Sequence, residues 1–358
     1  MRVIRKIGFY LMAVAALAFT ACSQIDDDLS DCQPESQVDY ELKLVTNMTT
    51  ELETQLNTVA DVLVSDALRK HLQNIFREFA HDVDLSFYDT AGDSVRLHHE
   101  THIMNDNQSS YTIYLPGREY THLAVANLVD NSLVSLRNDD RYHTHRLNQL
   151  AGDTLYSHET GVFTARHYMD VKGNVSQTFN VKLYMANCAS ALVVDTTGVD
   201  YRNIRVYSRG YATDFLAGDS AYVYADRSPF VRADAVNVEK GSDKIAFCCV
   251  SFPSRNPDGW WMKEKKEEVS TRVEGEIIRE GEEDESGEPL WEYIIYVTLN
   301  DGSVTQTVLT LHEPLLAGEL KVIVGKMDVE GVIHIFDTHV GVNVTLDWNP
   351  GLDFNSEI

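Results

Sequence analysis

The chain has 358 residues, enough for two domains of ordinary size, and 44% of them are hydrophobic, which is ample for buried cores. Its formal net charge of −25 argues against nucleic acid as a partner, because a strongly negative protein and the phosphate backbone repel one another. The same charge argues against electrostatic attachment to anionic lipid, so a membrane contact would have to be hydrophobic.

The N-terminus has the pattern of a secretory signal. Arg2, Arg5 and Lys6 form a basic start, and Ile7–Ala21 is an uninterrupted run of apolar or small residues. This run is shorter than the ~20 apolar residues that a membrane-spanning helix needs. The pattern therefore predicts a signal peptide over residues 1–21.

The end of this signal resembles a bacterial lipobox. Leu17–Cys22 reads LAFTAC, with Phe19 where a small aliphatic residue is usual. A lipobox predicts cleavage before Cys22 and lipidation of Cys22, which would tether the mature chain to a membrane through acyl chains. The alternative is a soluble secreted protein that is cut at the A-x-A-like pair Ala18 and Ala21.

An acidic tether is expected over residues 22–36. Asp26–Asp28 lies a few residues after Cys22 and resembles the acidic signal with which Bacteroidetes export lipoproteins to the outer face of the outer membrane. The alternative is an ordinary solvated linker. Surface display at the outer membrane is the prediction.

Four further cysteines remain if Cys22 carries lipid. Cys32, Cys188, Cys248 and Cys249 allow three disulfide pairings in an oxidising compartment. Cys248 and Cys249 are neighbours in an apolar, strand-like stretch, and neighbours in a strand point to opposite faces. They are therefore expected to be separate buried thiols. No C-x-x-C spacing supports a zinc ribbon or a thioredoxin-like site.

One helical segment interrupts a β-rich pattern. Val38–Thr46 alternates apolar and polar residues, as a half-buried strand does. From Thr50 to Phe79 the apolar residues recur at three- and four-residue steps, which predicts amphipathic helix over about residues 50–79. A break is expected near Asp61–Ser65, with Ser65 capping the second piece. The apolar stripe should pack on a sheet; binding of a membrane or partner is the alternative.

After His81 the chain reads as β-structure for most of its length. Short apolar or alternating runs are separated by Gly, Asn, Asp and Pro, which is typical of tandem β-sandwiches and not of a parallel α/β sheet. Domain boundaries are expected at 37–175 and 176–358, with a charged hairpin over about residues 262–290 in the second domain. Strands are predicted at Val83–Asp89, Ser94–Ile103, Ser110–Leu115, Tyr120–Leu128, Phe179–Asp195, Ile204–Ser208, Ala221–Ala225, Lys244–Phe252, Trp291–Leu299, Thr305–Leu311, Glu319–Met327, Val332–Asp337 and Gly341–Trp348.

One cluster of histidines is a candidate metal site. On a strand, His98, Glu100 and His102 would share a face, and two imidazoles with a carboxylate are a plausible zinc set. A polar solvent face explains the same residues equally well, and the helical H-E-x-x-H spacing of a metalloprotease is absent. Neither a serine nucleophile elbow nor a phosphate-binding loop occurs. We therefore predict a non-enzymatic protein without metal, catalytic residues or cofactor.

Several stretches together resemble the FimB-like family of Bacteroidetes fimbrial anchor lipoproteins. Tyr114–Asn127 is similar to that family's Gly-x-Tyr strand pair, and Leu315–Val324 with Val342–Phe354 is similar to its closing signature. The similar stretches span the mature chain and occur in the same order as in that family. Further matching stretches are Asp31–Cys32, Leu44–Thr50, Leu68–Phe79 and Ala80–Asp89.

The resemblance implies an all-β fold of two tandem transthyretin-like Greek-key β-sandwich domains, the first carrying the helix. It implies a place at the base of a cell-surface fimbria, with a fimbrial stalk subunit and outer-membrane lipid as partners and a role in limiting fimbrial length. Subunits of this kind join by strand addition. The short Asn349–Ile358 segment argues against strand donation from the C-terminus.

A surface glycan-binding lipoprotein is the alternative function. Aromatic side chains form platforms for sugars, and Trp260, Trp261 and Trp291 are the candidates. Tryptophans also fill sandwich cores, which is the competing interpretation of the same residues.

Overall fold

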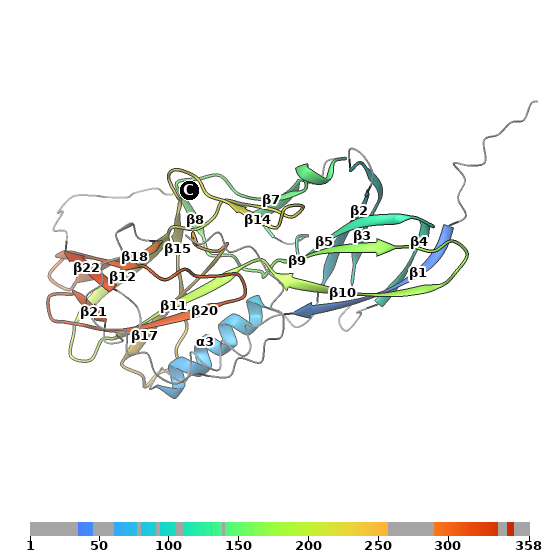
Figure 1. Cartoon of the computed structure of the whole chain (residues 1–358). Coiled ribbons are helices and arrows are strands. Elements are labelled where there is room, and N and C mark those ends of the chain that lie inside the picture. Colours follow the sequence, from blue (N-terminus) through green and yellow to red (C-terminus); the bar gives the residue numbers. More distant parts are fainter. Residues whose placement is uncertain are drawn as a thin grey trace, which may run out of the picture.

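The computed structural model describes residues 35–45, 61–76, 80–90, 94–104, 110–129, 131–137, 140–256, 290–335 and 342–346. Within these ranges the chain forms many short strands, one α-helix and the 3-10 turn Tyr142–Thr144 (Figure 1). The predicted all-β class with one inserted helix is confirmed. Two β-sandwiches lie end to end, at the right and left of Figure 1.

A seven-stranded sheet folds over on itself to make the first sandwich. Its strand order is β3-β2-β5-β9-β10-β1-β4, and β9 and β10 share only two paired positions, so the sheet bends between them. The layer β3-β2-β5-β9 packs on the layer β10-β1-β4. The strands are β1 (Glu35–Val45), β2 (Asp82–Asp89), β3 (Arg96–Ile103), β4 (Ser110–Pro116), β5 (Glu119–Ala126), β9 (Phe163–Asp170) and β10 (Gln177–Met185).

The alternating orientation of side chains along each strand explains how this core forms. Residues two apart point to the same face, so Val83, Leu85 and Phe87 of β2 face Ile113 and Leu115 of β4 across one apolar cluster. All five side chains are at most 1% exposed. The opposite face of β2 and β5 is covered by a second, four-stranded sheet.

The four-stranded sheet combines strands from distant parts of the chain. Its order is β14-β13-β7-β6, and Phe215 of β13 pairs with Leu147 of β7. Both side chains are buried with Tyr88 of β2. The strands are β6 (Val134–Arg137), β7 (Arg146–Gln149), β13 (Asp214–Leu216) and β14 (Ala221–Val223).

Two further sheets face each other in the second sandwich. A five-stranded sheet has the order β16-β17-β11-β20-β21, and a six-stranded sheet has the order β22-β19-β18-β12-β15-β8. Trp291, Tyr293 and Leu192 are among the buried residues between them. The strands are β8 (Thr154–Tyr156), β11 (Cys188–Asp195), β12 (Tyr201–Arg209), β15 (Phe230–Arg232), β16 (Asp234–Val236), β17 (Lys244–Ser251), β18 (Trp291–Leu299), β19 (Val304–Leu311), β20 (Leu320–Met327), β21 (Ile333–Ile335) and β22 (Val342–Leu346).

Helix α3 (Val62–Ile75) packs on the second sandwich, although in the chain it lies between β1 and β2 of the first. Its buried residues Val64, Leu68 and Leu72 meet the outer face of the five-stranded sheet, next to β16 and β17. Figure 1 shows the helix beneath this sheet. The predicted packing on a sheet is confirmed, but the sheet belongs to the second sandwich.

The helix begins one turn earlier than the predicted cap. Asp61 is the N-cap, and its Oδ1 accepts hydrogen bonds from the backbone N–H groups of Leu63 and Val64 at 2.9 and 3.2 Å. The predicted cap at Ser65 is wrong: its hydroxyl donates to the Asp61 carbonyl inside the first turn. The Ser242 hydroxyl donates to Asp61 Oδ2 at 2.6 Å, which attaches the cap to the second sandwich. The parts of the predicted helical segment at 50–60 and 77–79 lie outside the described residues.

The predicted division at residues 175 and 176 falls within the hairpin of β9 and β10. Here β10 pairs in parallel with β1 over eight positions and belongs to the first sandwich. Strand β8, from before the division, pairs with β15 in the second sandwich. The halves of the chain thus exchange elements, and the division into domains stays a prediction.

Candidate functional site

The open side of the first sandwich is the candidate functional site. Strands β3 and β4 end the two layers there, and each pairs on one side only with another described strand. The unpaired edge of a strand carries backbone N–H and C=O groups that can pair with a strand of another chain. The two edges differ in their chemistry.

Strand β4 is a regular edge without a charged side chain. Ile113 and Leu115 are buried, whereas Thr112 is exposed and Tyr114 is 55% exposed, so the strand alternates cleanly. The Thr112 hydroxyl donates to Asp39 Oδ1 at 2.8 Å, which fixes β4 to β1. β-branched and aromatic residues of this kind favour strand pairing. The β4 edge is therefore a suitable template for an incoming strand.

Strand β3 is a protected edge. Its even-numbered residues His98, Glu100 and His102 lie on the same face as the core residues of β2, because Leu85 is paired with Glu100. The two oxygens of Glu100 contact His98 Nε2 at 2.6 Å and His102 Nε2 at 2.7 Å. Inward-pointing charged residues are one of the ways in which proteins discourage pairing at an edge.

The candidate metal site is not supported by this geometry. No group of three or more histidine, cysteine, aspartate or glutamate side chains in the described ranges could hold a metal ion. Glu100 instead accepts hydrogen bonds from the two rings, which are about one third exposed. His98, Glu100 and His102 therefore form a polar strip along the rim of the core.

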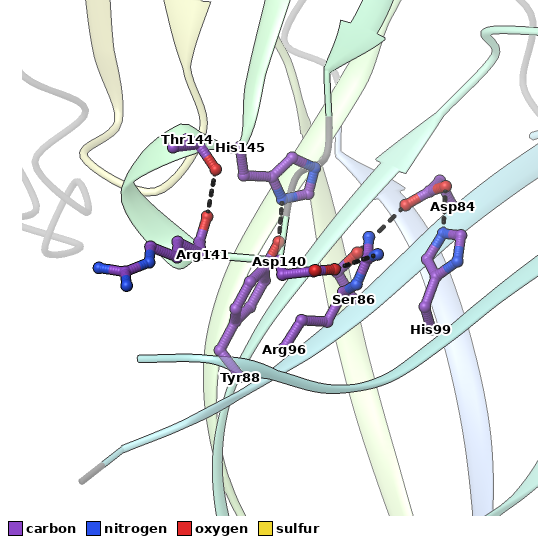
Figure 2. Close-up of polar contacts among 9 residues, drawn as sticks. All are labelled: Asp84, Ser86, Tyr88, Arg96, His99, Asp140, Arg141, Thr144 and His145. Carbon is purple, nitrogen blue, oxygen red and sulfur yellow. Dashed lines mark hydrogen bonds and ion pairs between the residues drawn. The ribbon is translucent and has the colours of Figure 1, made fainter. Parts of the chain in front are cut away.

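A second polar cluster covers the beginning of β3 on the opposite face of the sheet (Figure 2). Arg96 Nη2 donates to Asp140 Oδ1 at 3.0 Å, and the Arg96 backbone N–H donates to the Asp140 carbonyl at 2.7 Å. Val95 and Arg141 form an isolated antiparallel bridge, and the Tyr142 N–H donates to the Ser94 carbonyl. Residues 140–142 thus occupy the edge of β3 where the strand starts.

Buried titratable groups support the same cluster. The Tyr88 hydroxyl lies 3.4 Å from His145 Nδ1, and burial raises the pKa of Tyr88 to about 12 and lowers the pKa of His145 to about 4. Both groups are neutral at physiological pH. His99 Nε2 contacts Asp84 Oδ2 at 2.7 Å beside them. These contacts attach β2 to β3 and to the segment that contains His145. None of them activates a nucleophile.

The other edges in the described ranges are shorter. Strands β6, β8, β14, β16 and β21 have three or four residues, and β22 has five. Helix α3 contacts β16 as well. Strand β4, with seven residues, is thus the longest uncharged edge in the part of the chain that the structure describes.

The predicted lipidation site and two of the three candidate tryptophans lie outside the described residues: Cys22, Trp260 and Trp261. The signal peptide over 1–21, Cys32, most of the 22–36 tether, all but the last residue of the 262–290 hairpin and the segment 349–358 lie outside them too. No helix in the described ranges is long and apolar enough to cross a membrane.

The third candidate tryptophan is a core residue. Trp291 is 1% exposed, and its Nε1 donates to the Glu313 carbonyl at 2.9 Å. It therefore cannot present its ring to a sugar. Cys188, Cys248 and Cys249 are buried free thiols, as the sequence predicted for Cys248 and Cys249.

Local sequence patterns indicated neither the Arg96–Asp140 contact nor the position of β4 at an edge. The two residues of the ion pair lie 44 positions apart, in segments that read separately as strand and loop. A run of three polar residues facing a core, in a strand with alternating exposure, was the one available signal for the protected edge.

No family model and no curated protein matches the chain. Solved structures match over most of its length. A protein from Bacteroides ovatus described as a candidate adhesin has a TM-score of 0.48 at 15% identity, covering 81% of this chain and 86% of that one. The fimbrial anchor protein Mfa2 from Porphyromonas gingivalis has a TM-score of 0.45 at 9% identity, covering 87% and 99%. The C-terminally truncated tip fimbrial protein Mfa3 from the same organism has a TM-score of 0.36 at 10% identity, covering 88% and 100%.

Proposed function

We propose that this chain is a lipid-anchored structural subunit that attaches a cell-surface fimbria to the outer membrane. Acyl chains on Cys22 hold the protein in the membrane, and a strand of a fimbrial stalk subunit adds to the β4 edge. The single observation that carries the proposal is the seven-residue, uncharged β4 edge beside a β3 edge that is protected by charge and by residues 140–142.

Strand addition is the contact that such an edge supports best. Main-chain hydrogen bonds supply affinity, and pockets for alternate side chains supply specificity. Thr112 and Tyr114 are exposed on one face of β4, while Ile113 and Leu115 reach the core on the other. An incoming strand with apolar residues at every second position would extend both patterns.

The lipid on Cys22 would attach the protein, and with it the fimbria, to the membrane. Each buried CH₂ of an acyl chain contributes about 0.8 kcal/mol, and two or more chains make membrane attachment stable. The lipobox-like Leu17–Cys22 and the acidic Asp26–Asp28 support this part of the proposal and the location at the cell surface. A fixed base subunit of this kind is also suited to limiting fimbrial length.

A Cys22→Ala substitution in cells tests the proposal. We expect the variant protein to lose its lipid, as measured by intact mass, and to leave the membrane fraction together with the fimbriae. The matched control is Cys32→Ala, which removes a thiol ten residues away and should leave fimbriae attached. Fimbriae that stay attached at the normal length when the protein is absent would exclude the anchoring role.

A further inference from the structure

The outer face of the six-stranded sheet carries arginine and tyrosine side chains in adjacent rows. Residues that are paired across neighbouring strands share a face. Tyr156, Arg232, Tyr207, Ile294 and Val308 are paired in turn across β8, β15, β12, β18 and β19. The alternate residues of these strands are buried between the two sheets, so this row faces away from the core.

Guanidinium groups lie over aromatic rings on this face. Arg205 Cζ is 5.7 Å from the ring centroid of Tyr296, its cross-strand neighbour, and Arg209 Cζ is 5.5 Å from the ring centroid of Phe230. The Tyr207 and Tyr296 rings meet edge to face, with centroids 6.1 Å apart. These contacts hold the arginine side chains along the sheet while their remaining N–H groups stay available.

The face is locally positive in a strongly negative protein. Its outward positions on the five described strands β8, β12, β15, β18 and β19 include three arginines and a single carboxylate, Glu292, which pairs with Arg209 at 2.7 Å. No ion pair joins Arg205 to a carboxylate among the described residues, whereas Arg232 lies close enough to the Asp234 carboxylate to act on it electrostatically. Charges elsewhere on the surface are screened within about 8 Å at physiological ionic strength. An anionic ligand is therefore favoured at this face.

We infer that this Arg–Tyr face, made of Tyr156, Arg205, Tyr207, Arg209, Arg232 and Tyr296, binds an acidic polysaccharide. Planar guanidinium groups match carboxylate and sulfate oxygens in bidentate geometry. Tyrosine supplies an apolar ring surface together with a hydroxyl group that can hydrogen-bond. The ligand is thus a sugar polymer with uronate or sulfate groups.

The arrangement of this face suits a sugar polymer. Tyr207 has Arg205, Arg209 and Arg232 around it, so each ring lies next to a guanidinium group that can hold an acidic substituent of a sugar stacked on the ring. Tyr156 is 59% exposed at the rim, where it can extend the contact. The face lies on the second sandwich, away from the β4 edge, so this binding goes beyond the proposed attachment of fimbriae.

Binding of purified full-length protein, solubilised in detergent, to immobilised polymers tests the inference. The probes are polygalacturonate for carboxylates, dextran sulfate for sulfates, unmodified dextran as the neutral match, and polyglutamate as an acidic polypeptide. We expect retention on polygalacturonate or dextran sulfate, none on dextran, and weaker binding as salt rises. Comparison of the two anionic polymers identifies the preferred acidic group.

Variants locate the binding on the face. The double substitution Arg205→Ala with Arg232→Ala should weaken binding about tenfold or more, since each removed guanidinium takes away a charge-assisted contact. Tyr156→Ala, at an exposed position, should weaken it about threefold through loss of ring contact. Arg69→Ala is the matched control, because it removes one exposed arginine from helix α3 and should leave affinity unchanged.

Three outcomes would overturn the inference. The first is failure of the wild-type chain to bind either anionic polysaccharide. The second is equal binding by the double variant, with circular dichroism showing both proteins folded. The third is binding of polyglutamate in preference to both polysaccharides, which would make the face a docking site for an acidic protein.

Discussion

Strands β3 and β4 are the edge strands of the two layers of one sandwich, yet they differ in how well the edge is protected against pairing with an incoming strand. Strand β3 places His98, Glu100 and His102 toward the core and carries residues 140–142 at its start. Among the described residues, strand β4 has neither form of protection, and its own sequence contains no charged residue. A protein that needs only to stay monomeric would protect both edges. The difference supports the proposal that the β4 edge pairs with a strand of another subunit.

The two layers also differ in their sensitivity to acid. Burial lowers the pKa of His122 to about 3 and that of His145 to about 4, and both rings contact β2. Their unfolded pKa is about 6.5, so below that pH the unfolded chain binds protons that the folded chain does not, and stability falls as pH falls. The layer that contains β4 has no buried histidine among its described residues.

Acidification therefore gives the largest expected effect. Between pH 7 and pH 5 each of the two histidines should cost about 2 kcal/mol of unfolding free energy, and His158, whose pKa burial also lowers to about 4, should cost as much, or roughly 6 kcal/mol in all. The measurement is urea unfolding at both pH values. His122→Gln should remove about a third of the difference between them. An unchanged acid response in this variant would show that His122 does not carry the effect.

A charge in the β4 edge should weaken binding of the stalk subunit. Tyr114→Lys places an ammonium group on an exposed position of the edge, which opposes pairing with another strand. We expect stalk subunit binding to weaken about tenfold or more, equivalent to ~1.4 kcal/mol, in a pull-down with purified fimbrial protein. The matched control is Leu97→Lys on β3, at 41% exposure, which should bind as the wild type does. Equal losses in both variants would contradict the difference between the edges.

Removal of the polar strip should convert β3 into a second open edge. In His98→Val, Glu100→Thr and His102→Val combined, three β-branched residues replace the charged and polar ones. We expect weak self-association, with a dissociation constant between roughly 1 mM and 1 µM, or about −4 to −8 kcal/mol, by sedimentation. A triple variant that stays monomeric throughout this range would show that the strip does not protect the edge.

Release of residues 140–142 should have the smallest effect. Asp140→Ala breaks the contact with Arg96, and because Asp140 is 84% exposed the ion pair contributes at most about 1 kcal/mol. We expect little change in unfolding but faster hydrogen exchange at the Arg96 amide, which donates to the Asp140 carbonyl. Exchange at the amides of β4 serves as the internal reference and should not change.

Most of the strands could be predicted from local patterns, and several could not. The alternation in Ser110–Leu115 and Trp291–Leu299 predicted β4 and β18 closely. Strands β6, β7, β8, β9, β13, β15 and β16 were not predicted. All of them except β9 have only three or four residues, which is too short for a period of two to stand out.

For the candidate sites, too, local patterns identified residues but not their contacts in the folded chain. His98, Glu100 and His102 were expected on one face of a strand, and they lie there, but the hydrogen bonds of Glu100 with both rings could not be predicted from the sequence. Trp291 was ambiguous between a sugar platform and a core residue, and its burial resolves the choice. The Arg–Tyr face was not predicted, because its residues come from four strands, β8, β12, β15 and β18, that are far apart along the chain.

The sequence by itself determined the β-rich class, the amphipathic helical segment that contains α3, and the buried state of Cys248 and Cys249, since each depends on residues that are close along the chain. The tertiary structure decided that β1 pairs with β10, that helix α3 covers the second sandwich and that β4 ends a layer. A local pattern specifies which side chains are apolar, but strand order follows from the packing of distant segments. Whether an edge is open or protected is therefore a property of the folded chain.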